Sequence, residues 1–294
     1  MTEDSKVVVI ELNARRLQSD AEGFARLGKL HEEMSTLAGK EIRVNMSRVN
    51  WMDGHLASAF AIVALHAKLR NNAVRCMETR PNVRLVLQKN GLFRKKVEDR
   101  SNTAMPVRIF GLEDGVAFSQ YARLHLSRSE RPQMSAALEN KFYEGVDELF
   151  ANSALHSRSQ TGVVVCGQFY PRMKLLDFSI VDGGRTIAGS LRESGIVRHS
   201  DSEAIEWAVI SGNTTRQGDI PGGLGLKVLR DFIRMNSGKL TIVSGSGLWS
   251  QSHKGVIKER LTQPFPGTSV VLEINTSDEH QYDFVDGPNP TEIW

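Results

Sequence analysis

The sequence predicts an α/β protein made of two units joined by a polar connector. In the first hundred residues, short β-branched runs alternate with apolar helical patterns, which is typical of a sheet packed by helices. After residue 132, a long helical pattern precedes a strand that ends in Asp182-Gly-Gly. A glycine-rich turn then leads into a further helix.

Composition sets broad limits on function. With 294 residues the chain is long enough for two domains, and a content of 40% hydrophobic and 24% charged residues is ordinary for a globular protein. A net charge of +3 is too small to indicate nucleic-acid binding. Cys76 and Cys166 fall in different predicted units, so we expect a reducing compartment and no disulfide framework. No stretch approaches the ~18 apolar residues of a membrane span, so we expect a cytoplasmic protein.

The N-terminal elements follow from the spacing of their apolar residues. We expect strands at Val7 to Leu12, Glu41 to Met46 and Ala73 to Met77, and helices at Glu22 to Leu37, Leu56 to Leu69 and Asn82 to Lys89. Residues 96–132 are predicted to be a connector rich in charge and turn residues, with an apolar run at Val107 to Phe110 and a short helix after Gly111. Residues 277–294 are predicted to be a flexible acidic tail.

The segment Glu148 to Arg158 places polar side chains at a helical period. Glu148, Asn152 and His156 are four residues apart, so they share one face of a helix, opposite Phe142, Val146 and Leu149. A carboxylate one turn from a carboxamide suits a site that holds a metal and polarises a water. A solvated helix face is the alternative interpretation.

Two more segments carry candidate site residues. The run Lys174 to Gly184 predicts a strand that ends at Asp182, whose carboxylate can accept a hydrogen bond from an exocyclic amine; an Asp-Gly hairpin turn is the alternative. The residues Gly223, Leu224, Gly225 and Leu226 open a helix, so their amides face a passing anion. Between these segments, Glu203 to Ile210 is predicted to be helical.

These motifs, in this order, resemble the GHKL family of ATP-binding domains, which includes gyrase-type ATPases, histidine kinases and anti-sigma-factor serine kinases. The resemblance covers Gln133 to Asn275 and implies a two-layer α/β sandwich at residues 133–276. It includes a closing strand that contains Thr268. It departs from the family pattern at Thr186 and Pro221, where glycines are usual, and both residues are expected to stiffen the lid over the nucleotide.

The resemblance implies ATP and Mg²⁺ as cofactors, with Glu148 as the general base and Asn152 as the metal ligand. Asp182 and Gly184 would select adenine beside Thr268, and His156 belongs to the helix motif. The amides from Gly223 to Leu226 would hold the phosphates. In the lid, Arg216 of the Thr214-Thr215-Arg216 cluster would reach the γ-phosphate, although an Arg in a polar loop is more often exposed.

The N-terminal region resembles STAS domains, the fold of anti-sigma-factor antagonists, over Val7 to Phe93. The residues that carry this resemblance are Val44 to Asp53, before a long apolar helix, and Pro81 to Leu92. We therefore expect a STAS-like sheet with helices at residues 1–95. In phosphorylatable members a Ser pair follows the Asp, but here Gly54 and His55 follow Asp53.

Because an acceptor hydroxyl is missing there, we expect the STAS-like domain to act by contact. Its expected face lies around Trp51, Asp53 and His55, and it would dock on the ATP-binding domain or on a protein partner. A homodimer is compatible with the sequence. The leading hypothesis is a Mg-dependent ATPase switch. The alternatives are a serine/threonine kinase of the anti-sigma-factor type and an ATP sensor without turnover. No dimerisation helix of the histidine-kinase type is evident, so that class ranks last.

Overall fold

A three-stranded parallel sheet forms the centre of the N-terminal unit in the computed structural model, which describes residues 6–127, 132–210 and 224–283. The strand order is β1-β3-β5, with β1 at Val7–Glu11, β3 at Glu41–Asn45 and β5 at Ala73–Met77. The helices are α1 (Ala21–Ser35), α2 (Ala57–Leu69), which the 3-10 turn η1 (Gly54–Leu56) precedes, and α3 (Pro81–Lys89). The short strands β2 (Arg16–Leu17) and β4 (Trp51–Met52) pair in parallel. All six predicted elements of this unit are present, with ends that differ by at most two residues.

Local signals explain where these helices begin. The Asp20 carboxylate accepts a hydrogen bond from the Gly23 amide at 2.8 Å and caps α1. Pro81 occupies the first turn of α3, where a missing N–H costs nothing. Helix α2 is apolar around most of its circumference because neighbours cover it on several sides, including strands β8 and β9 of the other unit.

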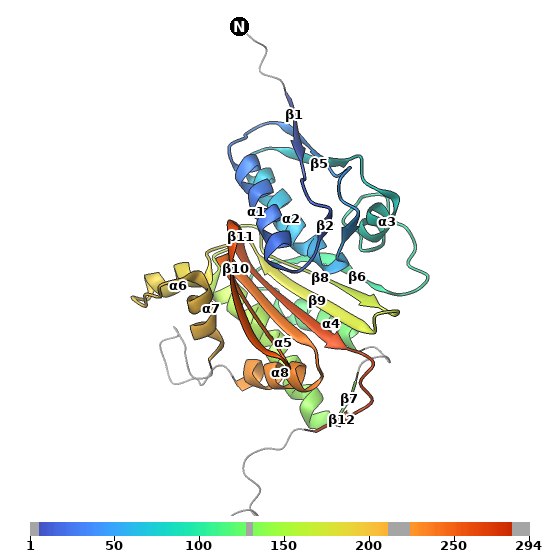
Figure 1. The fold of residues 1–294 in the computed structure, drawn as a ribbon, viewed down its shortest axis with the longest axis vertical. Coiled ribbons are helices and arrows are strands. Elements are labelled where there is room, and N and C mark those ends of the chain that lie inside the picture. The colour runs from blue at the N-terminus through green and yellow to red at the C-terminus, as the bar shows by residue number, and fades with distance from the viewer. Residues whose placement is uncertain (1–5, 128–131, 211–223, 284–294) are drawn as a thin grey trace, which may run out of the picture.

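The C-terminal unit is built on a five-stranded antiparallel sheet in the order β10-β11-β9-β8-β6. Its strands are β6 (Ala104–Phe110), β8 (Val163–Tyr170), β9 (Leu175–Asp182), β10 (Lys239–Ser252) and β11 (Gly255–Asn275). Helices α4 (Gly115–Leu126), α5 (Ala136–His156) and α8 (Leu224–Met235) lie on one face, and α6 (Ile187–Glu193) and α7 (Asp201–Val209) lie beside β10 (Figure 1). The predicted helix at 203–210 is therefore confirmed.

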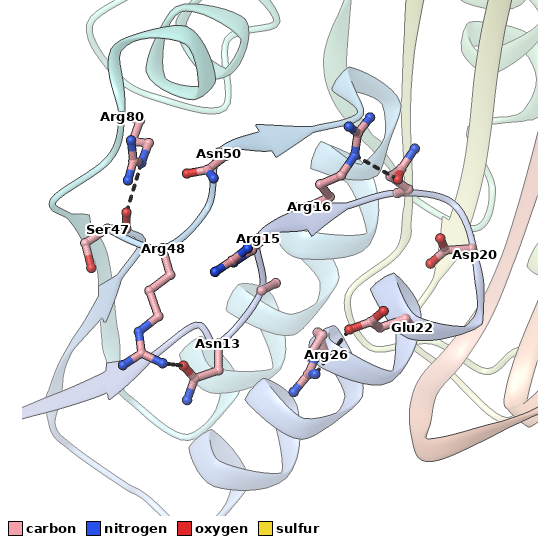
Figure 2. A pocket seen from close by; sticks show the side chains of 12 residues that line it. Asn13, Arg15, Arg16, Asp20, Glu22, Arg26, Ser47, Arg48, Asn50 and Arg80 are labelled. Carbon is pink, nitrogen blue, oxygen red and sulfur yellow. Dashed lines mark hydrogen bonds and ion pairs between the residues drawn. The ribbon is translucent and has the colours of Figure 1, made fainter.

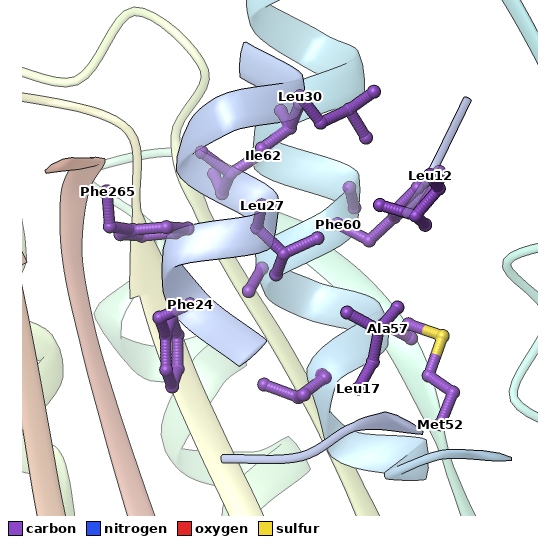
Figure 3. Packing of buried hydrophobic residues seen from close by; sticks show 14 of the residues in the cluster. Leu12, Leu17, Phe24, Leu27, Leu30, Met52, Ala57, Phe60, Ile62 and Phe265 are labelled. Atoms are coloured by element: carbon purple, nitrogen blue, oxygen red, sulfur yellow. The ribbon is translucent and has the colours of Figure 1, made fainter. Parts of the chain in front are cut away.

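Both faces of this sheet are covered, which explains why β8 and β9 are buried along almost their whole length. On one face, Val163 and Val165 pack in the cluster that contains α4, α5 and α8. On the other face, Val164 and Cys166 belong to the core of the N-terminal unit. Figure 3 shows this second contact at the edge of α1, where Phe24 packs edge-to-face against Phe265 of β11 with ring centroids 5.4 Å apart.

The predicted connector at 96–132 is corrected in part by the structure. Its apolar run lies in β6, which pairs with β8 at the sheet edge, so this segment belongs to the C-terminal sheet. The helix expected after Gly111 is present as α4, which packs on α5. The apolar side chains of Phe110 and Phe118, buried in the same cluster, are the physical reason. The predicted loose tail is also partly ordered, since β12 (Gln281–Tyr282) pairs with β7 (Gln133–Met134) and Tyr282 packs on Phe232.

Within the described residues, no helix has the length and apolar character needed to cross a membrane.

Candidate functional site

Helix α5 carries three of the candidate site residues. The Ser135 hydroxyl caps it by accepting a hydrogen bond from the Leu138 amide at 3.3 Å. Phe142, Val146 and Leu149 are buried, as the helical period predicted. On the polar stripe Glu148, Asn152 and His156 are all half-buried, so the stripe is not a fully solvated face.

Asp182 lies at the end of β9, with its side chain buried beneath α5. Its Oδ1 accepts a hydrogen bond from the Gly184 amide at 3.0 Å, and the Ser153 side chain and the Thr268 backbone also contribute hydrogen bonds. Burial raises the pKa of Asp182 to about 7, and these hydrogen bonds only partly oppose it. A donor that reaches this carboxylate therefore meets an acceptor that has lost most of its water.

Glu148 connects α5 to the start of α8. The amide of Leu226 donates to Glu148 Oε2 at 3.1 Å, although the two residues are 78 positions apart. Leu226 is in the first turn of α8, where backbone amides have no partner within the helix and the helix dipole favours negative charge. The Glu148 carboxylate therefore occupies a position that favours an anionic oxygen.

The two glycines after Asp182 are required by close contacts. A Cβ on Gly184 would lie 2.1 Å from the carbonyl oxygen of Ser157, just beyond the end of α5. A Cβ on Gly183 would lie 2.5 Å from His66 Nε2 on α2. Gly183 and Gly184 therefore pack between α5 and the N-terminal unit. A hairpin turn at Asp182-Gly183, the alternative interpretation, is excluded because β9 already pairs with β8 on one side and β11 on the other.

Thr268 lies opposite Asp182 in the register of β11 and β9. Its hydroxyl lies 2.9 Å from the Ser244 hydroxyl, which accepts a hydrogen bond from the Ile187 amide at 2.9 Å. The closing strand is thus connected to the beginning of α6. Thr186 has a φ of −68° and caps α6 by accepting a hydrogen bond from the Gly189 amide at 3.1 Å. The β-branched residue therefore occupies a position that needs no positive φ.

Arg185 closes the end of α5 near His156. Its guanidinium donates to the His156 carbonyl oxygen at 2.8 Å, and its amide donates to the Ser157 carbonyl oxygen at 2.6 Å. It also pairs with Glu193 at the end of α6. The last turn of α5 is therefore held to the segment that follows Asp182.

Part of the predicted site lies outside the described residues: Thr214, Thr215, Arg216, Pro221 and Gly223. Leu224 and Gly225 begin α8 as predicted.

Sequence reasoning missed Ser153 and His66, which contact the site or its surroundings, and it missed the partner of His55. Ser153 bonds to Asp182 but lies off the i, i+4 stripe. His66 and His55 lie in the N-terminal unit, about 120 residues from their partners. His66 Nε2 is 2.7 Å from the Gly183 carbonyl oxygen, and His55 Nδ1 is 3.1 Å from Asp177 Oδ2 on β9. No local pattern could have identified these contacts.

The face expected for docking, around Trp51, Asp53 and His55, contacts the C-terminal sheet. His55 is 0% exposed, and its Nε2 lies 3.0 Å from the Ser19 hydroxyl. The Gly54 amide donates to the Tyr170 hydroxyl at 2.8 Å. Burial opposes the charged form of His55, but the nearby carboxylates, chiefly that of Asp177, raise its pKa above the ordinary value.

No protein-family model matches the chain, and no curated protein matches it either. The resemblances described above therefore depend on the motifs and on where the fold places them.

Proposed function

We propose that the C-terminal unit is an ATP-binding module of the GHKL type and that the protein is a Mg-dependent ATPase switch. One observation carries the proposal. Helix α5 contacts Asp182 through Ser153 and the first turn of α8 through Glu148, so motifs far apart in the sequence converge on one location. The antiparallel sheet with α4, α5 and α8 on one face is compatible with the two-layer sandwich of that family.

The hydrogen-bond donors and acceptors of the site suit ATP. Asp182 provides a buried acceptor for the exocyclic amine of adenine, with Thr268 directly across the strand pair. The first turn of α8 provides amides for phosphate oxygens, and the carboxylate that now accepts from Leu226 supports the affinity of this helix end for an anion. Binding of a triphosphate there would release Glu148 from the Leu226 amide.

Asn152, one turn beyond Glu148 on α5, would hold the Mg²⁺ ion through its side-chain oxygen. Mg²⁺ typically takes one or two protein ligands and completes its shell with water and phosphate. When bound, the ion neutralises charge that develops on the phosphates. Within the described residues, no cluster of three His, Cys, Asp or Glu side chains could hold a metal alone, so the proposal requires the nucleotide as a further ligand.

Glu148 would act as the general base for a water that attacks the γ-phosphate. Its half-buried position on the same face of α5 as Asn152 supports this role. In the present arrangement its Oε2 is occupied by the Leu226 amide. Nucleotide binding and activation of the base would therefore occur together.

The N-terminal unit, for which we propose a STAS-like fold, is positioned to sense this change. His66 contacts the carbonyl oxygen of Gly183, directly after Asp182, and His55 pairs with Asp177 on the same strand. A protein partner on the N-terminal unit could thereby respond to the nucleotide. Self-phosphorylation at the start of α2 is disfavoured, because Gly54 and His55 offer no hydroxyl and the Ser58 hydroxyl is buried against Ser179 at 2.8 Å.

The test is to incubate the purified protein with Mg²⁺ and ATP labelled on the γ-phosphate. The ATPase switch predicts release of labelled phosphate, reduced in Glu148→Gln. A serine/threonine kinase would instead label an added polypeptide, and a sensor would bind ATP without releasing phosphate. If the parent protein neither binds ATP nor releases phosphate, all three forms of the proposal are contradicted.

A further inference from the structure

A basic groove lies in the N-terminal unit, away from the residues that form the candidate nucleotide site. It is a hollow of about 910 Å³ at the carboxyl ends of β1 and β3, where the loops after these strands meet the beginnings of α1 and α3 (Figure 2). We call it the arginine groove, after the five arginines among its lining residues: Arg15, Arg16, Arg26, Arg48 and Arg80. In open α/β sheets, this edge is where ligands commonly bind.

The charge in the groove is unbalanced. The lining contains five arginines and two carboxylates, those of Asp20 and Glu22, which leaves +3. This equals the formal net charge of the entire chain. Glu22 pairs with Arg26 at 3.1 Å, and Asp20 is used to cap α1. The other four arginines form no ion pair with a carboxylate in the part of the chain that the structure describes.

Neutral groups hold three of these guanidinium groups in place. Arg48 donates to Asn13 Oδ1 at 2.6 Å, Arg80 donates to the Ser47 carbonyl oxygen at 3.0 Å, and Arg16 donates to Gln18 Oε1 at 3.0 Å (Figure 2). Each bond uses one of about five guanidinium N–H donors and leaves the positive charge uncompensated. The groups are thus oriented by contacts that do not neutralise them, which lowers the entropic cost of binding an anion.

We propose that the arginine groove binds a small ligand with two or more phosphoryl groups. The planar guanidinium donates two parallel hydrogen bonds to a phosphate, and every cation in the lining is an arginine. The volume lies within the ~300–1,000 Å³ of small-molecule sites. A single phosphate would match about half of the uncompensated charge. This ligand site is separate from the proposed ATP site and does not depend on it.

The experiment is calorimetry with inorganic tripolyphosphate in Mg²⁺-free buffer of low ionic strength, on the full chain. The parent protein should bind, and inorganic phosphate should bind at least tenfold more weakly. Arg15→Ala and Arg48→Ala should each weaken tripolyphosphate binding by about tenfold to a hundredfold. Because both side chains are exposed, these variants should keep the thermal stability of the parent.

A matched control makes the result specific. Arg172→Ala removes the same charge from an exposed turn outside the groove and should bind like the parent. Equal affinity in the parent and both groove variants would overturn the proposal. So would groove-dependent binding of single-stranded DNA or anionic vesicles by a protein that does not bind tripolyphosphate.

Discussion

His66 Nε2, on α2 of the N-terminal unit, lies 2.7 Å from the carbonyl oxygen of Gly183, directly after Asp182. Among the described residues, His66 Nδ1 is buried without a hydrogen-bond partner, so the hydrogen is on Nε2, which donates to Gly183. Burial lowers the pKa of His66, which keeps the ring neutral at physiological pH. The N-terminal unit therefore contacts the backbone of the proposed adenine motif through one defined hydrogen bond.

Replacing His66 should weaken ATP binding although none of the residues proposed to contact ATP is changed. His66→Ala removes the bond to Gly183 and should weaken ATP binding by about three- to tenfold, the value of one hydrogen bond. His66→Gln can still donate and should recover much of the loss. Calorimetry on the two variants tests this. Identical affinities for parent, Ala and Gln variants would show that the contact does not couple the units.

Glu148→Gln separates binding from turnover. The amide oxygen of Gln can still accept from Leu226, so the start of α8 should remain in place. If Glu148 is the base, phosphate release should fall about 10²- to 10⁴-fold with nearly unchanged ATP affinity. Asn152→Ala should instead weaken binding of Mg-ATP itself. Parent-like hydrolysis by Glu148→Gln would place the base elsewhere.

The pair formed by His55 and Asp177 should contribute to stability. His55→Leu leaves a buried carboxylate without its partner and should reduce the free energy of unfolding by about 3–5 kcal/mol. Replacing both residues by Leu removes the unpaired charge and should recover a large part of that loss. Chemical denaturation of the parent and both variants provides the measurement. A double variant less stable than His55→Leu alone would contradict this account.

Asp182 should give stability a distinct pH dependence. Its pKa is raised from 3.8 to about 7 by burial, so the protonated form favours the folded state. The associated stability is fully present below about pH 4 and is lost as the pH rises towards 7, a change of roughly 4 kcal/mol. The difference in unfolding free energy between parent and Asp182→Asn, measured from pH 4 to 8, should follow this curve. A difference independent of pH would show that Asp182 titrates normally.

The sequence predicts the local features of this protein well. The stripe of Glu148, Asn152 and His156 is recognisable because the helical period places these residues on one face. The strand that ends at Asp182 is recognisable from its β-branched and aromatic residues and from the two glycines that follow it. The six N-terminal elements are predicted for the same reasons. Strands β8 and β10 were not anticipated, because a strand that is buried on both faces lacks the alternation that would identify it.

The contacts between the units could not be predicted from local patterns. Pairing of β6 with β8 turns a supposed connector into a sheet edge, and only the partner strand reveals this. His55 was expected on a docking face, and it does contact the C-terminal sheet, but its partner Asp177 lies more than 120 residues away and no local pattern identifies it. The arginine groove was also missed, because its residues come from loops that only the parallel sheet brings together.

Calorimetric titration of ATP into the parent protein and Asp182→Asn, in the presence of Mg²⁺, tests the central proposal most directly. The substitution keeps the size of the side chain but replaces one acceptor by a donor that faces the adenine amine. ATP affinity should fall by about tenfold to a hundredfold, the value of a charge-assisted hydrogen bond. Asp114→Asn, the same change at an exposed position outside the site, should leave the affinity unchanged. Equal ATP affinity in the parent and Asp182→Asn, or no ATP binding by the parent, would contradict the assignment of this site.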